Sequence, residues 1–503
     1  MTAIRPFSPG LYTSERQSQS LQKMRGEMNT LNQQLATGRR VETLGGLGSA
    51  RTSVLDLRAQ LAGIEGHSQA VTRGDVRVKL MTGALDHLQS LTRAAKTDAL
   101  GASQVTTATA MNTAVLTARG RLEEALAQLN TDYDGQYLFS GRASDKKPVL
   151  DAGALLEGSP GKDGLRTLIT ERRQADLGDG LGRLSLGVAG AVVTLGEEAA
   201  GLPFGIKLNG IRSGLSNAAQ TGPTGAPAAE TVTLTGAPSE GETIDFDLTL
   251  PDGSKETLRL TARTVLRPGT AEAAFAIDAD PVVTAGNLKT ALDTALRAAA
   301  REKLNAASAI VATRDLLEGS ASVAPPRIAG PPFASATGFA APGTRNTVIW
   351  FAGDDTTTDP RRSQTATIDR GLTVGVGSTA NEAAIRNTIA GFAALAADQF
   401  SATDTSAQGR FRALSERISA ELTPENGQRL QDISAELSIS GASMGAANSR
   451  HLQRSALLEE AVANIEKPSL EELSAGILGL QTRLQASYQA TASISRLSLA
   501  DYL

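Results

Sequence analysis

The sequence has no cysteine, only three histidines, and an aromatic fraction of 3% across its 503 residues. Without cysteine the chain can form no disulfide and no thiolate metal site, so its stability must come from packing or from assembly. An enzyme of this size would normally fill its core with many more aromatic side chains. The histidines, His67, His87 and His451, do not have the spacing of metal ligands. We therefore expect no metal, no cofactor and no enzymatic activity.

Strong net charge and long apolar segments are also missing. The formal net charge is −4, whereas a nucleic-acid-binding protein needs a strongly cationic surface. No segment approaches the ~20 apolar residues of a membrane-spanning helix, and the first residues lack the apolar centre of a cleavable signal peptide. We expect neither a nucleic-acid partner nor a membrane span. A cytoplasmic location is the simplest expectation, and export by a route that recognises an unstructured N-terminus stays open.

Apolar residues do recur at alternating spacings of three and four near both ends of the chain. A mean spacing of about 3.5 residues puts them on one narrow seam of a helix, which is useful only when another helix covers it. That cover is expected from the opposite end of the chain or from a neighbouring subunit. The last residues add apolar side chains that suit an anchor between subunits. These positions form the candidate assembly interface: Leu21, Met24, Met28, Leu31, Leu35, Leu470, Leu473, Ile477, Leu480, Leu484, Ile494, Leu499, Tyr502 and Leu503.

The same periodicity predicts helices in both halves of the chain. The expected helices cover 14–37, a long region that ends near 132, a region that starts at Thr423, and a last segment after 469. Gly38 suits the end of the first helix, and Pro424 suits the first position of the third. Ser469 and Glu472 form a capping box at the start of the last helix. The two ends of the chain are expected to pair in antiparallel directions.

The middle of the sequence, residues 143–345, has the features of an inserted α+β region. Apolar and polar residues alternate over 244–250 and 256–262, with Pro-Asp-Gly-Ser between them, which predicts a β-hairpin. Apolar residues on one face predict a helix over 287–305. Further strands are expected over 307–313, over 347–351, and as a pair within 365–376.

Two short motifs resemble chemical sites but have simpler structural explanations. The segment Gly441–Gly445 has the spacing of a nucleophile elbow, which requires a preceding strand and a later acid and histidine. Here the segment lies inside a predicted helix. Asp354, Asp355 and Asp359 could offer oxygen ligands to a hard cation, but their spacing favours an exposed acidic loop. We expect no catalytic serine and no metal at these positions.

Three segments resemble bacterial flagellins and their junction relatives. Thr37–Val41 (TGRRV) resembles the segment that follows the first flagellin helix. Gly135–Gly141 (GQYLFSG) and the tail Ser493–Leu503 (SISRLSLADYL) are similar to segments of the hook–filament junction proteins, also called hook-associated protein 3. The chain lacks the Gln- and Asn-rich ending that is typical of filament flagellins, which favours the junction branch. The resemblance covers about 1–142 and 346–503.

This resemblance implies a mainly α fold in three layers. Residues 1–45 and 466–503 would form an inner antiparallel coiled coil, 46–142 and 346–465 a helical rod with a small β element, and 143–345 a β-rich α+β outer domain. It also implies self-assembly into a ring or tube, with a hook-side junction protein and filament flagellin as neighbours. Export would use the flagellar type III apparatus, with a chaperone on the C-terminal helix, and the protein would be extracellular.

Two alternatives stay open at this point. The first is a flagellin subunit of the filament itself. The second comes from another class: residues 143–345 could be an enzyme or a carbohydrate-binding module that the helical rod displays. The hairpin and helix of that segment suit a small binding domain, but its sequence contains no acid pair or ligand cluster that supports a specific chemistry.

Overall fold

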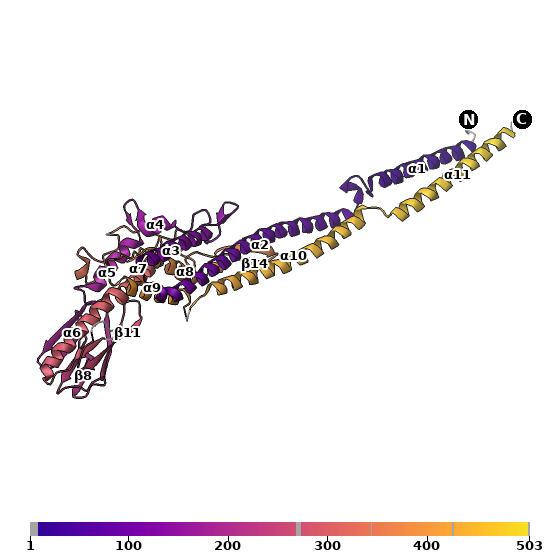
Figure 1. The fold of residues 1–503 in the computed structure, drawn as a ribbon. Helices are drawn as coiled ribbons and strands as arrows, with labels where there is room; N and C mark the ends of the chain where they lie inside the picture. Colours follow the sequence, from indigo (N-terminus) through magenta and orange to yellow (C-terminus); the bar gives the residue numbers. More distant parts are fainter. Residues whose placement is uncertain (1–8, 268–272, 344, 425–426, 501–503) are drawn as a thin grey trace. The chain divides into compact units, whose positions relative to one another are not determined.

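The computed structural model describes residues 9–267, 273–343, 345–424 and 427–500, and the chain divides into two compact units. The first unit comprises Met1–Arg73, Thr367–Leu372 and Met444–Leu503. The second unit comprises Gly74–Ala366 and Thr373–Ser443. Figure 1 shows both units, with labels on the helices and on some of the strands. The expected mainly helical fold, with helical ends and an inserted strand-rich region, is confirmed.

The first unit is built from long helices that lie side by side in antiparallel pairs (Figure 1). Its elements are α1 (Pro9–Thr37), a short 3-10 turn (Leu44–Leu47), the first part of α2 (Ala50–Leu100), the last part of α10 (Leu430–Glu466) and α11 (Leu470–Ala500). As expected, α1 ends before Gly38, which has a φ of +64° and donates its N–H to the Gln34 carbonyl at 2.8 Å. A positive φ suits glycine because other side chains are strained there.

The second unit contains a helical body and a strand-rich module. Its helices are the rest of α2, α3 (Ala108–Leu129), α4 (Ala152–Glu157), α5 (Leu165–Leu177), α6 (Pro281–Ala299), α7 (Asn305–Glu318), α8 (Ala383–Ala396), α9 (Ala407–Leu422) and the start of α10. A π-helical segment (Ala300–Leu304) joins α6 to α7. Nearly every residue of α8 is buried or half-buried, because α3, α7 and α9 all pack against it.

Two four-stranded sheets form the core of the strand-rich module. The first has the order β5 (Leu184–Ala189), β6 (Val192–Glu197), β9 (Ala229–Leu234) and β8 (Ala218–Thr224). The second has the order β12 (Ala274–Ala276), β11 (Lys255–Arg263), β10 (Thr243–Thr249) and β7 (Lys207–Ser213). The sheets and α6 share one apolar core, which includes Phe246, Phe275 and Leu292.

Short two-stranded pairs complete the described strands. They are β1 (Asp132–Tyr133) with β2 (Gln136–Tyr137), β3 (Gly158–Ser159) with β4 (Lys162–Asp163), and β13 (Thr365–Asp369) with β14 (Leu372–Gly375). The expected hairpin around Pro-Asp-Gly-Ser is confirmed as β10 and β11, in which Thr249 pairs with Lys255. The expected strand pair within 365–376 is confirmed as β13 and β14.

Three local predictions were wrong. Residues 307–313 are helical within α7, because α7 packs against α5, α8 and α9. Residues 347–351 form only isolated bridges, and Trp350 is buried with its indole N–H donating to the Leu317 carbonyl at 2.6 Å. The third helix begins at Leu430 and not at Thr423, since α9 continues to Leu422.

Candidate assembly surface

The candidate assembly interface lies mainly on α1 and α11, which pack against each other in antiparallel directions (Figure 1). In the first half of α1, the Gln17 side-chain amide donates to the Thr491 hydroxyl at 3.2 Å. Further along α1, the Arg25 guanidinium donates to the Tyr488 hydroxyl at 2.7 Å and lies over the ring. The two helices therefore run in opposite directions, as expected when the end of the chain returns to its beginning.

A glycine allows the two helices to approach closely near the start of α11. A Cβ atom added to Gly476 would lie 3.2 Å from Leu31 Cδ1, whereas one added to Gly479 would meet open space. Glycine inside a helix costs ~1 kcal/mol relative to alanine. At Gly476 this cost is offset by the close packing of Leu31, and at Gly479 no such contact is present.

The seam residues of the pair are buried to different degrees. Leu473 and Leu480 are buried. Several other members are half-buried: Leu21, Met24, Met28, Leu31, Ile477 and Leu484. The structure leaves Leu35 at 48% and Leu470 at 69% exposure. The central parts of the two seams therefore contact each other. Leu35, near the end of α1, and Leu470, at the start of α11, stay outside this contact.

The remaining members of the candidate interface are at the end of the chain. Ile494 and Leu499 belong to α11, but their side chains lie outside the described part of the structure. Tyr502 and Leu503 lie outside the described residues altogether. The role of these residues as an anchor between subunits stays a prediction.

The sequence analysis missed one large apolar residue on α11 that faces away from the pair. Leu478 is 63% exposed. Because it directly follows Ile477, it lies outside the seam spacing and does not belong to the predicted stripe. A strictly solvated helix face would normally be polar at such a position. Together with Leu470, Leu478 defines the outer apolar face of α11.

Polar contacts fix where the last helix begins. The Arg40 N–H donates to the Glu466 carbonyl at 2.7 Å, and the Glu466 carboxylate pairs with Arg58 at 2.6 Å. The Ser469 hydroxyl accepts the Glu472 N–H at 3.2 Å, which is one half of the expected capping box. The loop after α1 and the end of α10 are thereby tied together, and α11 starts directly after this junction.

The nucleophile-elbow motif has an ordinary helical environment. Gly441–Gly445 lies inside α10, and the Ser443 hydroxyl donates to the Ile439 carbonyl one turn earlier at 3.0 Å. This is the local bond that serine commonly makes within a helix. Within the described ranges, no group of three or more His, Cys, Asp or Glu is arranged to hold a metal ion.

Each of the three aspartates in the acidic loop has its own protein partner. Asp354 pairs with Arg142 at 2.6 Å, and this hydrogen-bonded guanidinium holds the pKa of the carboxyl well below its usual range. Asp355 accepts from the Ser322 hydroxyl at 2.6 Å, which lowers its pKa. Asp359 accepts from backbone N–H groups of the following 3-10 turn. The three carboxylates therefore bind three separate sets of groups.

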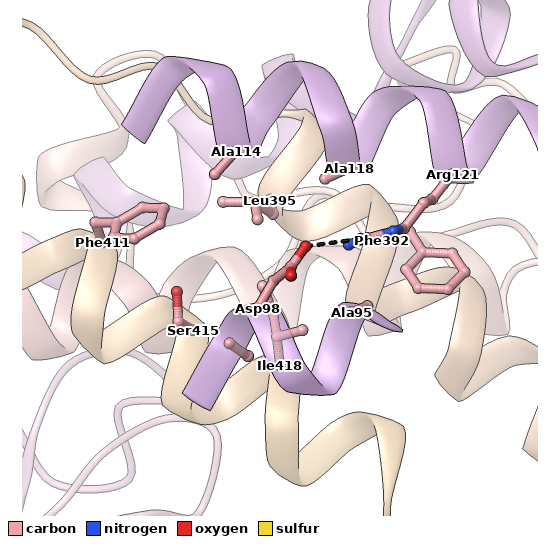
Figure 2. Close-up of a pocket in the computed structure, with 12 residues that line it drawn as sticks. Ala95, Asp98, Ala114, Ala118, Arg121, Phe392, Leu395, Phe411, Ser415 and Ile418 are labelled. Carbon is pink, nitrogen blue, oxygen red and sulfur yellow. Dashed lines mark hydrogen bonds and ion pairs between the residues drawn. The ribbon is translucent and has the colours of Figure 1, made fainter. Parts of the chain in front are cut away.

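A small cavity lies in the helical body between the end of α2, α3, α8 and α9 (Figure 2). It has a volume of about 40 Å³, far below the ~300 Å³ at which ligand sites usually begin. Ala118 and Leu395 are among its lining residues, and Asp98 and Arg121 form an ion pair beside it at 2.7 Å. The cavity is therefore a packing defect in the helical body.

Residues 11–144 match the family described as the bacterial flagellin N-terminal helical region. The matched segment includes most of α1, all of α2 and α3, and the β1–β2 pair, and it is less than half of the chain. The match supports the resemblance to bacterial flagellins for this part of the chain. No curated protein matches the sequence. Of the helices that the structure describes, none combines the length and apolar character needed to cross a membrane.

Proposed function

We propose that the chain is a structural subunit of the bacterial flagellum that assembles through α1 and α11. The observation that carries this proposal is the outer apolar face of α11, because Leu470 and Leu478 remain exposed after α1 has covered the seam. The flagellin match over residues 11–144 supports the same function. A structural subunit performs no chemistry, so the proposal includes no catalytic residue and no cofactor.

The energetics favour assembly at a growing end over pairing of free subunits. Burying one Leu-sized side chain contributes about 1.5–3 kcal/mol, whereas ordering one residue costs about 1–2 kcal/mol. A contact with a single neighbour that orders a whole helix end therefore gains little. Several neighbours that cover the same helix pair at once shift the balance towards association.

We further propose that the subunit belongs to the junction between hook and filament. The segment Gly135–Gly141 and the segment Ser493–Leu503 support this assignment. Its partners would then be other copies of itself, a hook-side junction protein and filament flagellin. Export through the flagellar type III apparatus, a chaperone on the C-terminal helix and an extracellular location are parts of the same proposal. The three layers with boundaries near 45, 142, 345 and 465 also belong to it.

A gene deletion separates the junction protein from the filament flagellin. Loss of a junction protein should leave hooks without filaments, with filament flagellin secreted into the medium as monomers. Loss of the only flagellin should leave no filament protein in the medium. The second result would overturn the junction assignment and favour the alternative of a filament subunit.

Purified protein tests the assembly surface itself. Leu478→Gln should keep the α1–α11 pair intact, because Leu478 faces away from α1, and should slow growth on flagellar seeds. Gln481→Ala, on the same helix, is the control for an exposed position without an apolar side chain. Far-UV circular dichroism would check the helices of both variants. Normal seeded growth of Leu478→Gln and of Leu470→Gln would contradict the proposed role of this face.

A further inference from the structure

The tip of the β13–β14 hairpin lies against the helix pair of the first unit at one particular place. The tip residues Thr367–Leu372 belong to that unit together with the neighbouring parts of α2 and α10. The Asp369 carboxylate lies 3.9 Å from Nε2 of His451 on α10. This is beyond an ordinary hydrogen bond, yet close enough for a strong interaction between charges.

The imidazole of His451 is unusual because it is buried without a hydrogen bond. The side chain is 4% exposed, and neither ring nitrogen has a hydrogen-bond partner among the described residues. Buried polar atoms are nearly always paired, so an unpaired imidazole calls for an explanation. Met444 and Ala447 precede it on the same buried stripe of α10. An apolar side chain would complete that stripe at no polar cost.

A second imidazole approaches from the opposite helix. The His67 ring on α2 lies with its centroid 6.1 Å from that of His451, at an interplanar angle of 32°. The other charged groups near the pair are Arg450 on α10 and Arg370 at the hairpin tip, and both side chains are exposed. The Arg370 backbone N–H donates to Asp369 at 2.8 Å. This hydrogen bond is the largest cause that lowers the pKa of Asp369, and the nearby charges of His451, His67 and Arg450 lower it further.

We propose that His451, His67 and Asp369 form a proton-operated latch that holds the hairpin tip on the helix pair. One proton taken up by the imidazole pair is placed on His451, next to the carboxylate. The protonated ring then donates from Nε2 to Asp369, and a neutral ring–carboxylate contact becomes a charge-assisted hydrogen bond. A second proton would put two positive charges on adjacent rings, which repel each other. The imidazole pair therefore takes up a single proton first.

The direction of the effect follows from the charges. Asp369 stays ionised across the working range because its pKa is lowered, so only the imidazoles change charge there. Imidazoles as a class change charge between pH 5 and 8. The hairpin tip should therefore be held more firmly at pH 6 than at pH 8. One added charge-assisted hydrogen bond of this kind corresponds to a change of about tenfold or more in an opening equilibrium.

Hydrogen exchange on the full-length chain tests the latch. Protection of the amides of Thr367–Leu372, corrected for the intrinsic pH dependence of exchange, should rise about tenfold from pH 8 to pH 6. Asp369→Asn should abolish this rise, because the amide removes the negative partner and keeps the shape. His87→Gln is the matched control, since His87 pairs with Glu124 away from this cluster, and it should leave the rise unchanged.

A second measurement keeps the test informative if a buried substitution loosens the helices. The chain has only three histidines, so selective ¹³C labelling of the imidazoles gives three resolvable signals that can be titrated in the folded protein. The His451 signal should change over the same pH range as the hairpin protection, and in Asp369→Asn the two should no longer change together. Equal protection at pH 6 and pH 8, or a rise that survives Asp369→Asn, would overturn the proposal. A His451 signal that changes with pH independently of the hairpin protection in the unmodified chain would overturn it as well.

Discussion

Glu230 provides the sharpest stability prediction, because it is a buried carboxyl group without a hydrogen-bond partner among the described residues. It lies on β9 with Val232 and Leu234 on the buried face of that strand, and its side chain is 1% exposed. Neither carboxylate oxygen has a hydrogen-bond partner in the described part of the chain. Burial, and then the nearby negative charge of Asp247, raises the pKa of Glu230 from 4.5 to about 7. The strand-rich module should therefore be sensitive to pH.

The sign and the size of this effect follow from linkage. Since the folded pKa lies above the unfolded one, the folded chain holds an extra proton between pH 4.5 and about 7. The contribution of Glu230 to stability is therefore complete below pH 4.5 and is lost as the pH rises through 7. At 1.36 kcal/mol per pH unit, the total loss is about 3 kcal/mol. Glu230→Gln keeps the shape of the side chain and removes the ionisation, so this pH dependence should disappear.

Hydrogen exchange of the β6 and β9 amides at pH 5 and pH 8 would measure the effect, with the α3 amides as an internal reference. The opening free energy of β9 in the unmodified chain should fall by about 2–3 kcal/mol over this range, after correction for intrinsic rates. In Glu230→Gln it should stay nearly constant. A flat or rising profile in the unmodified chain would refute the reasoning, and so would a slope that persists in the variant.

Four further substitutions test packing in other parts of the structure. Gly476→Val should separate α1 from α11 at Leu31 and reduce the protection of α1 in hydrogen exchange. Gly479→Ala should instead stabilise α11 by up to ~1 kcal/mol. Equal effects of the two substitutions would contradict the close approach of the helices at Gly476. Ala118→Val should fill part of the cavity in Figure 2 and raise the free energy of unfolding by about 1 kcal/mol. A higher melting temperature would show this effect. Arg327→Met should lower stability by about 1–3 kcal/mol in chemical denaturation, because the buried Glu171 carboxylate loses one of its two arginine partners and keeps only Arg345.

The sequence was most informative where local rules and packing agree. The alternation on both sides of Pro-Asp-Gly-Ser predicted the β10–β11 hairpin, since turn chemistry and burial lead to the same pairing there. Gly38 marked the end of α1 for a similar reason, because its backbone conformation belongs to glycine. The antiparallel pairing of the chain ends followed from the seam spacing together with the need for the chain to return.

Local rules failed where tertiary packing decides. The segment 307–313 contains β-branched residues, and its helical state depends on contacts with α5, α8 and α9 that no local pattern contains. Pro424 suits a helix start, yet the helix begins six residues later at Leu430, where the Asp432 carboxylate accepts the Arg429 N–H at 2.9 Å. The proximity of His67, Asp369 and His451 could not be inferred either, because they come from three distant segments.

The candidate assembly surface needed both kinds of information. The seam spacing located α1 and α11. Only the structure shows which of their apolar residues are buried between the two helices and which stay exposed. Leu473 and Leu480 belong to the first group, and Leu470 and Leu478 belong to the second. A layer of two helices can bury one stripe on each helix and no more. Side chains on the opposite side of α11 then stay in water unless another helix arrives, at a cost of about 1.5–3 kcal/mol for each large apolar group. We therefore expect the partner of this face to be helical, and its own apolar stripe to match the spacing from Leu470 to Leu478.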